Sequence, residues 1–166
     1  MSKRFPLTGI LLALASVGLL FACEPKVIPG TQIQDTPETR SLATLVVEKY
    51  RRAMEAREAD TIAGMCSPRF HETGGTPGAE DDYNLDGLKK RLAEKFKRIK
   101  AMTLDIVLID INIDEEKQPN TAAVKYHYFL KYLVEFPHEE KWETQSEDAQ
   151  MLFTLENAEW KVTSGL

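Results

Sequence analysis

The hydrophobic period of the chain changes once, close to residue 100. Before that point, apolar residues recur at spacings of three and four, which is typical of amphipathic helices. After it, apolar and polar residues alternate, which is typical of strands with one buried face. Helices followed by several long strands indicate an α+β fold, in which helices cover one face of an antiparallel sheet. The sequence therefore predicts three N-terminal helices packed on an antiparallel sheet of about four strands.

The expected helices cover residues 36–57, 60–68 and 85–100. Thr36 can cap the first helix, and Pro37 loses no hydrogen bond at the first helical position. Asp60 is the expected cap of the second helix. Cys66 falls in an apolar turn of that helix without a basic neighbour, so we expect a small buried hydrophobic residue rather than a nucleophile.

The expected strands cover residues 103–114, 121–136, 142–155 and 160–163. The apolar alternation of the first strand shifts by one residue midway, which indicates either a β-bulge or a strand buried on both faces. In the second strand, Tyr126 and Tyr128 share one face, whereas His127 lies on the other. We therefore expect a buried tyrosine-lined face and a solvent-exposed face on this sheet.

The N-terminus has the pattern of a secretory signal: Lys3 and Arg4 precede a run without charges from Leu7 to Phe21. The run of about 15 residues is shorter than the roughly 20 that a membrane-spanning helix needs. Its last four residues, Leu20-Phe21-Ala22-Cys23, resemble a bacterial lipobox, with Phe21 bulkier than usual. The resemblance implies cleavage between Ala22 and Cys23 and attachment of acyl chains such as palmitate to Cys23.

A lipid on Cys23 would make this chain a lipoprotein of the bacterial cell envelope. Two or more acyl chains give a stable membrane anchor, whereas one gives marginal binding. Glu24 is not the aspartate that resembles an inner-membrane retention signal, so the outer membrane is the expected location. The alternative is an ordinary cysteine at the end of an apolar helix.

Three regions follow: a signal peptide over residues 1–22, a lipidated flexible tether over 23–35, and one domain over 36–166. Pro25, Pro29 and Gly30 give the tether its composition. Removing the signal lowers the basic count from 21 to 19 against 26 acidic residues, a net charge of −7. Nucleic acid is not an expected partner, because its affinity depends on neutralising phosphates.

Three segments resemble the nuclear-transport-factor-2-like superfamily, which includes ketosteroid-isomerase-like and SnoaL-like proteins. They are the Val47-x-x-Tyr50-x-x-Ala53 helix, the helix ending at residues 67–70, and the terminal strand of residues 160–166. The resemblance covers most of residues 36–166 and implies that the sheet is curved and forms a cone with an apolar cavity. Members include isomerases, dehydratases, transport adaptors and binding domains, so the fold does not select a function.

Tyr50, Tyr126 and Tyr128 are the candidate lining of such a cavity. In the isomerase-like members, an aspartate with a tyrosine or acid donor performs acid–base chemistry. The inward strand faces offer no clear aspartate here; Asp105 and Asp110 are candidates only if the bulge turns them inward. The residues therefore favour a non-catalytic domain.

Asp82, Asn84, Asp86 and Gly87 match the first half of a calcium-binding loop. The position that should carry the closing glutamate is Ala93. We therefore prefer a capped helix entrance, with Asn84 or Asp82 as the cap, and keep calcium as the alternative. Asp110, Asn112 and Asp114 match the same pattern less well, because Glu115 replaces the glycine.

The third helix carries a basic run, for which docking to anionic lipid headgroups is one interpretation and a solvated face the favoured one. The run is Lys89, Lys90, Arg91, Lys95, Lys97, Arg98 and Lys100. His71, His127 and His138 are scattered, so zinc is not expected. His127 is expected at the surface or in a dimer contact.

The sequence favours a membrane-anchored lipoprotein with a non-catalytic domain that binds a small apolar ligand or a protein partner at the cell envelope. No cofactor is expected. One alternative is an isomerase- or dehydratase-like enzyme that uses the cone cavity. Another is a dimeric envelope scaffold that associates through the outer face of the sheet.

Overall fold

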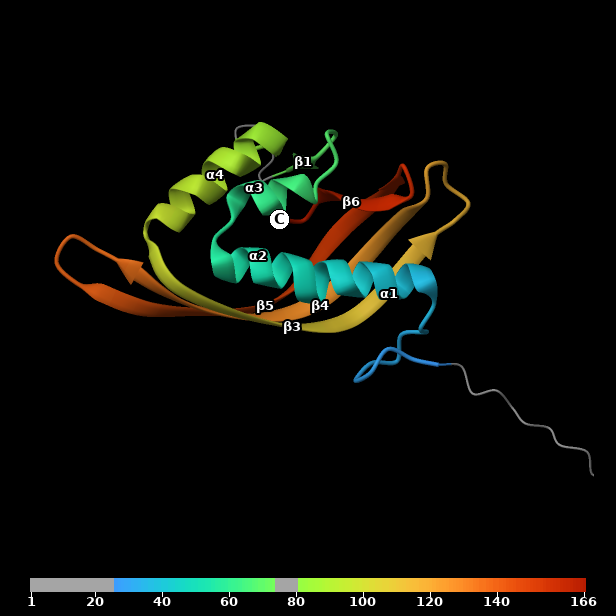
Figure 1. The fold of residues 1–166 in the computed structure, drawn as a ribbon, viewed down its shortest axis with the longest axis horizontal. Coiled ribbons are helices and arrows are strands. Elements are labelled where there is room, and N and C mark those ends of the chain that lie inside the picture. The colour runs from blue at the N-terminus through green and yellow to red at the C-terminus, as the bar shows by residue number, and fades with distance from the viewer. Residues whose placement is uncertain (1–25, 74–80) are drawn as a thin grey trace, which may run out of the picture.

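A computed structural model describes residues 26–73 and 81–166 (Figure 1). The predicted signal peptide and its cleavage and lipid-attachment residues, Ala22 and Cys23, lie outside this range. Within it, no helix is long and apolar enough to span a bilayer.

The first helix is continuous through three segments: α1 (Pro37–Ala43), the π-helical η1 (Thr44–Tyr50) and α2 (Arg51–Ala56). The predicted cap is confirmed, because the Thr36 hydroxyl accepts from the backbone N–H of Thr39 at 3.2 Å. The Thr39 hydroxyl oxygen in turn accepts from the backbone N–H of Thr36 at 2.9 Å. Arg57 ends the helix in a left-handed conformation, with φ of 59°.

The second helix, α3 (Ala59–Gly64), differs from its prediction at both ends. Asp60 lies in the first turn rather than at the cap, because the chain reverses at Arg57 and re-enters a helix after Glu58. The helix ends before Pro68, because the next residues pair with the last strand. Ser67 donates its backbone N–H to the carbonyl of Val162 at 2.8 Å.

The third helix, α4 (Leu85–Lys97), begins at the predicted cap. The Asn84 side-chain oxygen accepts from the backbone N–H of Gly87 at 3.1 Å. The helix is three residues shorter than expected, because Ile99 already belongs to the sheet. A two-residue strand, β1 (His71–Glu72), pairs with β2 (Tyr83–Asn84) just before α4.

The sheet has the order β3-β4-β5-β6 and is antiparallel throughout. Its strands are β3 (Ile99–Asp114), β4 (Thr121–Glu135), β5 (Glu140–Glu156) and β6 (Glu159–Ser164). The predicted bulge is confirmed: Leu108 pairs with Tyr126 and Asp110 with Lys125, so Ile109 is the additional residue. The α+β class and the antiparallel sheet of about four strands predicted from the sequence are thus correct.

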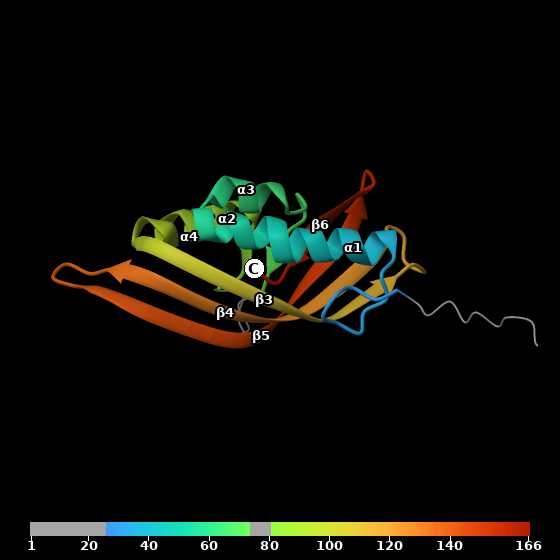
Figure 2. The same cartoon turned by 60° about the horizontal axis from the view of Figure 1, so that its bottom comes forward.

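The helices cover one face of the curved sheet, and none of the described helices covers the other face (Figures 1 and 2). We call these the inner and outer faces. Leu42 and Val46 from the first helix and Val124, Met151 and Phe153 from the sheet are fully buried between the two layers.

Residues 26–35 are part of the domain, which corrects the prediction of a flexible tether there. A bridge joins Val27 to Gln34, and the backbone N–H of Asp35 donates to the carbonyl of Lys26 at 2.7 Å. Ile33 is buried in the main core. Pro29 and Gly30 thus belong to the turn of a small N-terminal hairpin, with Gly30 at a φ of 79°.

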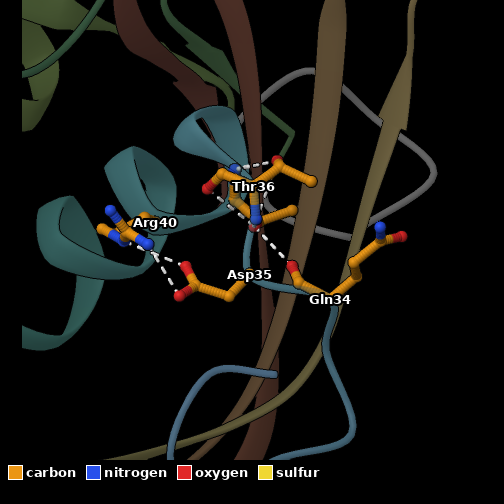
Figure 3. Close-up of polar contacts among 5 residues, drawn as sticks. Gln34, Asp35, Thr36 and Arg40 are labelled. Carbon is orange, nitrogen blue, oxygen red and sulfur yellow. Dashed lines mark hydrogen bonds and ion pairs between the residues drawn. The ribbon is translucent and has the colours of Figure 1, made fainter. Parts of the chain in front are cut away.

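The N-terminal hairpin is fastened to α1 by side chains (Figure 3). The Arg40 guanidinium donates to both carboxylate oxygens of Asp35, at 2.9 and 2.7 Å. The Thr39 hydroxyl donates to the backbone carbonyl of Gln34 at 2.6 Å. These contacts hold the hairpin against the start of the long helix.

Candidate functional site

A cavity of about 240 Å³ lies between the long helix and the inner face of the sheet. Tyr50, Tyr126 and Tyr128, the three residues expected to line a pocket, all contribute to its wall. The apolar part of the wall is formed by Met54, Leu104, Leu130, Ala149 and Leu166, and the polar part by Lys95 and Gln145. We call this the cone cavity.

The three tyrosines lie close together because the spacing of the helix directs Tyr50 toward the cavity and the alternation of β4 directs Tyr126 and Tyr128 toward it. Tyr50 ends η1 and belongs to the helix stripe that packs on the sheet. Tyr126 and Tyr128 are two residues apart on β4 and therefore point to the same inner face. Their ring centroids lie 6.4 Å apart at an interplanar angle of 45°. Such tilted packing is favourable for aromatic pairs.

The phenols in the cavity stay neutral at physiological pH. Burial raises the pKa of Tyr50 and of Tyr126 well above the usual value, and the neighbouring phenols add to the shift. Burial also raises the pKa of Tyr128, as does the nearby Glu147 carboxylate. The cavity therefore offers hydroxyl groups that donate or accept hydrogen bonds, rather than a base.

The two aspartates considered for acid–base chemistry lie outside the cavity. Asp105 pairs with Phe129 and Asp110 with Lys125, and both aspartates are exposed. Asp105 precedes the bulge and faces outward by the ordinary alternation of the strand. The extra residue, Ile109, shifts this alternation by one position, so Asp110 also faces outward. Among the described residues, no aspartate or glutamate side chain lines the cone cavity, and the Glu147 carboxylate lies beside the hydroxyl of Tyr128 in its wall.

The acidic stretch of residues 82–87 is a capped helix entrance in the structure. Asn84 caps α4, and Asp82 lies 3.4 Å from the His71 ring nitrogen. Within the described ranges, no group of three histidine, cysteine or acidic side chains is arranged to hold a metal ion. A Cβ atom on Gly87 would lie 2.7 Å from that of Tyr83. Close packing thus accounts for the glycine without a calcium loop.

The basic residues of α4 are exposed, and several have partners within the chain. Lys97 pairs with Glu94 at 2.6 Å, and Lys100 at the start of β3 pairs with Glu135 at 2.9 Å. The Arg91 guanidinium lies 4.2 Å from the centroid of the Tyr83 ring. These contacts agree with the solvated-face interpretation of the basic run.

Cys66 is buried, as expected, and its thiol donates to the carbonyl of Ile62 at 3.5 Å. Burial raises the pKa of Cys66 to about 12. Because the thiolate is the reactive form, this cysteine has a structural role in the core.

His127 lies on the outer face and is within hydrogen-bonding distance of two side chains of β5. The sequence analysis did not predict these two contacts. Its Nδ1 is 2.7 Å from the Asp148 carboxylate, and its Nε2 is 2.9 Å from the Ser146 hydroxyl. These partners become visible only with the register, which places Asp148 directly opposite His127. The pair is exposed, so its contribution to stability is small.

A second hollow, of about 550 Å³, lies beside the free edge of β3. The N-terminal hairpin, the first helix and the bulged part of β3 form its walls. Its apolar lining comes from Ile28, Pro29, Ala43, Val47, Ile106, Val107 and Leu108. We call this hollow the N-terminal groove. Sequence reasoning missed it, because residues 26–35 were expected to be a tether.

Comparisons with known proteins identify the fold. No family model matches the sequence, and no curated protein matches it. A solved structure of a conserved protein from Planctomyces limnophilus is similar, with a TM-score of 0.61 at 15% identity. The match covers 77% of this chain and 94% of the other.

Two further solved structures are similar to this chain, and one of them is described as NTF2-like. One is a Streptomyces avermitilis protein from the NTF2-like family, with a TM-score of 0.57 at 17% identity over 78% of this chain and 95% of the other. The other is a hexachlorocyclohexane dehydrochlorinase, with a TM-score of 0.60 at 7% identity over 77% and 82% of the chains. The chain therefore has the NTF2-like cone fold that the resemblance implied.

Proposed function

We propose that this protein is a bacterial lipoprotein, anchored through Cys23 in the outer membrane, whose cone domain binds a small apolar ligand without transforming it. The observation that carries the proposal is the composition of the cone cavity. Three neutral phenols and a largely apolar wall surround it, Lys95 and Gln145 add two polar groups, and no aspartate or glutamate side chain of the described residues lines it. Such a lining suits binding better than acid–base catalysis.

The cavity limits the chemistry of the ligand. Its volume of about 240 Å³ lies below the roughly 300–1,000 Å³ of typical drug-sized pockets. The ligand is therefore a compact molecule with mostly apolar surface. The hydroxyls of Tyr50, Tyr126 and Tyr128 favour one that carries a hydroxyl or carbonyl group.

Binding can be tested on the full chain with 1-naphthol, a compact aromatic molecule with one hydroxyl. Ala149→Phe places a large side chain in the cavity wall and should abolish saturable binding in a calorimetric titration. Ala123→Phe adds the same side chain at a position of β4 outside the cavity lining, and should leave the affinity unchanged. Equal affinities of the two variants would refute the proposed site.

Tyr128→Phe removes one hydroxyl from the cavity wall and keeps the ring. Loss of one neutral hydrogen bond should weaken binding by roughly 0.5–1.5 kcal/mol, or about twofold to tenfold. Loss of water from a small β-hydroxy ketone in the presence of the wild-type chain, absent with Ala149→Phe, would favour the dehydratase-like alternative instead.

The anchor has an independent test. Metabolic labelling with a fatty-acid analogue should mark the wild-type chain, and Cys23→Ala should lose the label. Labelling of the variant at the wild-type level would refute lipidation at Cys23, while leaving the ligand-binding result unaffected.

Homodimerisation through the outer face is the second candidate, and exposed apolar side chains favour it. Phe129 on β4 and Trp142 and Leu152 on β5 are large hydrophobic residues that remain exposed on strands of this sheet. Exposed apolar groups of this kind mark interaction surfaces when they gather on one face. A second copy of the chain would cover them.

A further inference from the structure

We propose that the N-terminal hairpin and the neighbouring edge of β3 form a docking face for the bilayer that holds Cys23. This proposal rests on the lipid anchor of the proposed function. It adds an orientation: the domain lies against the membrane with one defined edge instead of moving freely on a tether.

The length of chain between the anchor and the ordered domain supports this orientation. Cys23 is three residues before Lys26, where the described hairpin begins. Three residues span at most about 11 Å even when fully extended. The lipid on Cys23 belongs at the membrane surface, so the hairpin must lie within that distance of the bilayer.

The short distance to the bilayer also fixes the position of the whole domain, because the hairpin is packed against the core and against α1. The backbone N–H of Ile28 donates to the carbonyl of Ile33 at 2.9 Å, and Ile33 is buried in the core. Arg40 binds Asp35 through two hydrogen bonds, which fasten the end of the hairpin to α1 (Figure 3). A rigid connection of this kind fixes which surface faces the lipid.

Three large apolar side chains are exposed on the hairpin and the neighbouring edge of β3. Val27 in the hairpin is 44% exposed, and Val107 and Ile109 on β3 are 60% and 50% exposed. Val107 lines the N-terminal groove together with Ile28 and Pro29. Ile109 lines a smaller hollow with Gln32 and Ile33, so the hairpin runs beside both exposed strand residues. Insertion of such side chains between lipid headgroups removes them from water.

The charged residues near this edge do not require the bilayer to carry charged lipid headgroups. Asp35, the acid in the groove wall, is paired with Arg40, whose hydrogen bonds hold the pKa of this carboxyl below its usual value. Glu48 is the second acid in the wall of the N-terminal groove, and Asp110 and Glu115 line the smaller hollow beside Ile109. The basic helix α4 lies toward the opposite end of the molecule in both views (Figures 1 and 2). Docking at the hairpin edge therefore needs no anionic lipid.

The test uses the full lipidated chain in phosphatidylcholine vesicles that contain a nitroxide-labelled lipid as quencher. A fluorescent probe is attached to a cysteine introduced in Val107→Cys. Matched probes at Lys90→Cys on α4 and Thr144→Cys on β5 report the far helix and the far end of the outer face. We expect severalfold stronger quenching at position 107 than at positions 90 and 144.

A second variant tests the apolar contact itself. Val27→Glu combined with Ile109→Glu places two charges on the docking face at exposed positions. Quenching at position 107 should then fall to the level of position 90, with the thermal unfolding midpoint and the mass of the lipidated chain unchanged.

The outcomes separate this inference from the proposed function. Intact mass spectrometry that finds no lipid on Cys23 overturns the membrane anchor and the docking face, and leaves the ligand-binding part of the proposed function unaffected. A lipidated chain with equal quenching at all three positions overturns the docking face alone. Protection of position 107 in native envelopes but not in lipid vesicles would assign the face to a protein partner, and would also overturn docking on the bilayer.

Discussion

At the scale of the single residue, Glu156 joins two segments that are 89 residues apart. Its carboxylate accepts hydrogen bonds from Arg69 at 2.9 Å and from Ser67 at 2.8 Å. The Arg69 and then the Ser67 hydrogen bond lower the pKa of Glu156 from its ordinary 4.5. Because the pKa falls on folding, the stabilisation is present above the ordinary value and is lost as pH falls through the folded value. Glu156→Gln should lower the urea midpoint at pH 7 and have a smaller effect at pH 3.

Glu116→Gln is the matched control, since Glu116 is an exposed glutamate in the turn between β3 and β4. This control should leave the urea midpoint unchanged at both pH values. A Glu156→Gln effect of equal size at pH 7 and pH 3 would contradict the role of the ionised carboxylate.

At the scale of the element, α4 depends on a side chain that precedes it. Asn84 satisfies the N–H of Gly87, one of the unpaired donors of the first helical turn. Asn84→Ala should reduce the free energy of unfolding by about 1 kcal/mol, whereas Asn84→Asp should retain the cap and cost far less. Chemical denaturation of the three proteins measures both differences.

The same proteins decide the calcium alternative for residues 82–87. Added calcium should leave the thermal midpoint of the wild-type protein unchanged, because Asn84 already uses its oxygen as the cap. A calcium-dependent increase in the midpoint that is lost in Asn84→Ala would instead identify a cation site.

At the scale of the whole molecule, the proposed homodimer would associate through the outer face of the sheet. Burial of Phe129 near the centre of a dimer interface would make it a strong contributor to binding. Phe129→Glu should then weaken self-association by more than about 2 kcal/mol, or roughly 30-fold. Sedimentation equilibrium of the full chain in detergent measures this change. Lys90→Glu on α4 is the control and should associate as the wild type does; a wild-type chain that stays monomeric would contradict the dimer.

Local patterns in the sequence were sufficient to predict that a layer of helices packs on a layer of strands. Thr36 and Asn84 cap helices as predicted, because a cap depends on residues only three positions apart. The phase shift near Ile109 predicted the bulge, since alternation along a strand records which face each side chain occupies. Asp60 was wrongly predicted as a cap, because the left-handed turn at Arg57 moved the helix start by two residues.

The candidate site was predicted only in part. The convergence of Tyr50, Tyr126 and Tyr128 could be anticipated, because helix and strand periodicities directed each of them to the interior. The cavity volume and the outward position of Asp105 could not, because they depend on sheet curvature and on strand register. The same holds for the partners of His127 across β5.

The sequence by itself determined the order of helices and strands, the buried face of each and the tyrosine lining, because these follow from spacings within a few residues. The tertiary structure alone decided that residues 26–35 pack on the domain and that a groove lies between the N-terminal hairpin and β3. Ile33 and Asp35 acquire this order only from contacts with the core and with Arg40. Proline and glycine content describes local chain preference, whereas burial depends on surfaces that exist only after the helices and sheet have assembled.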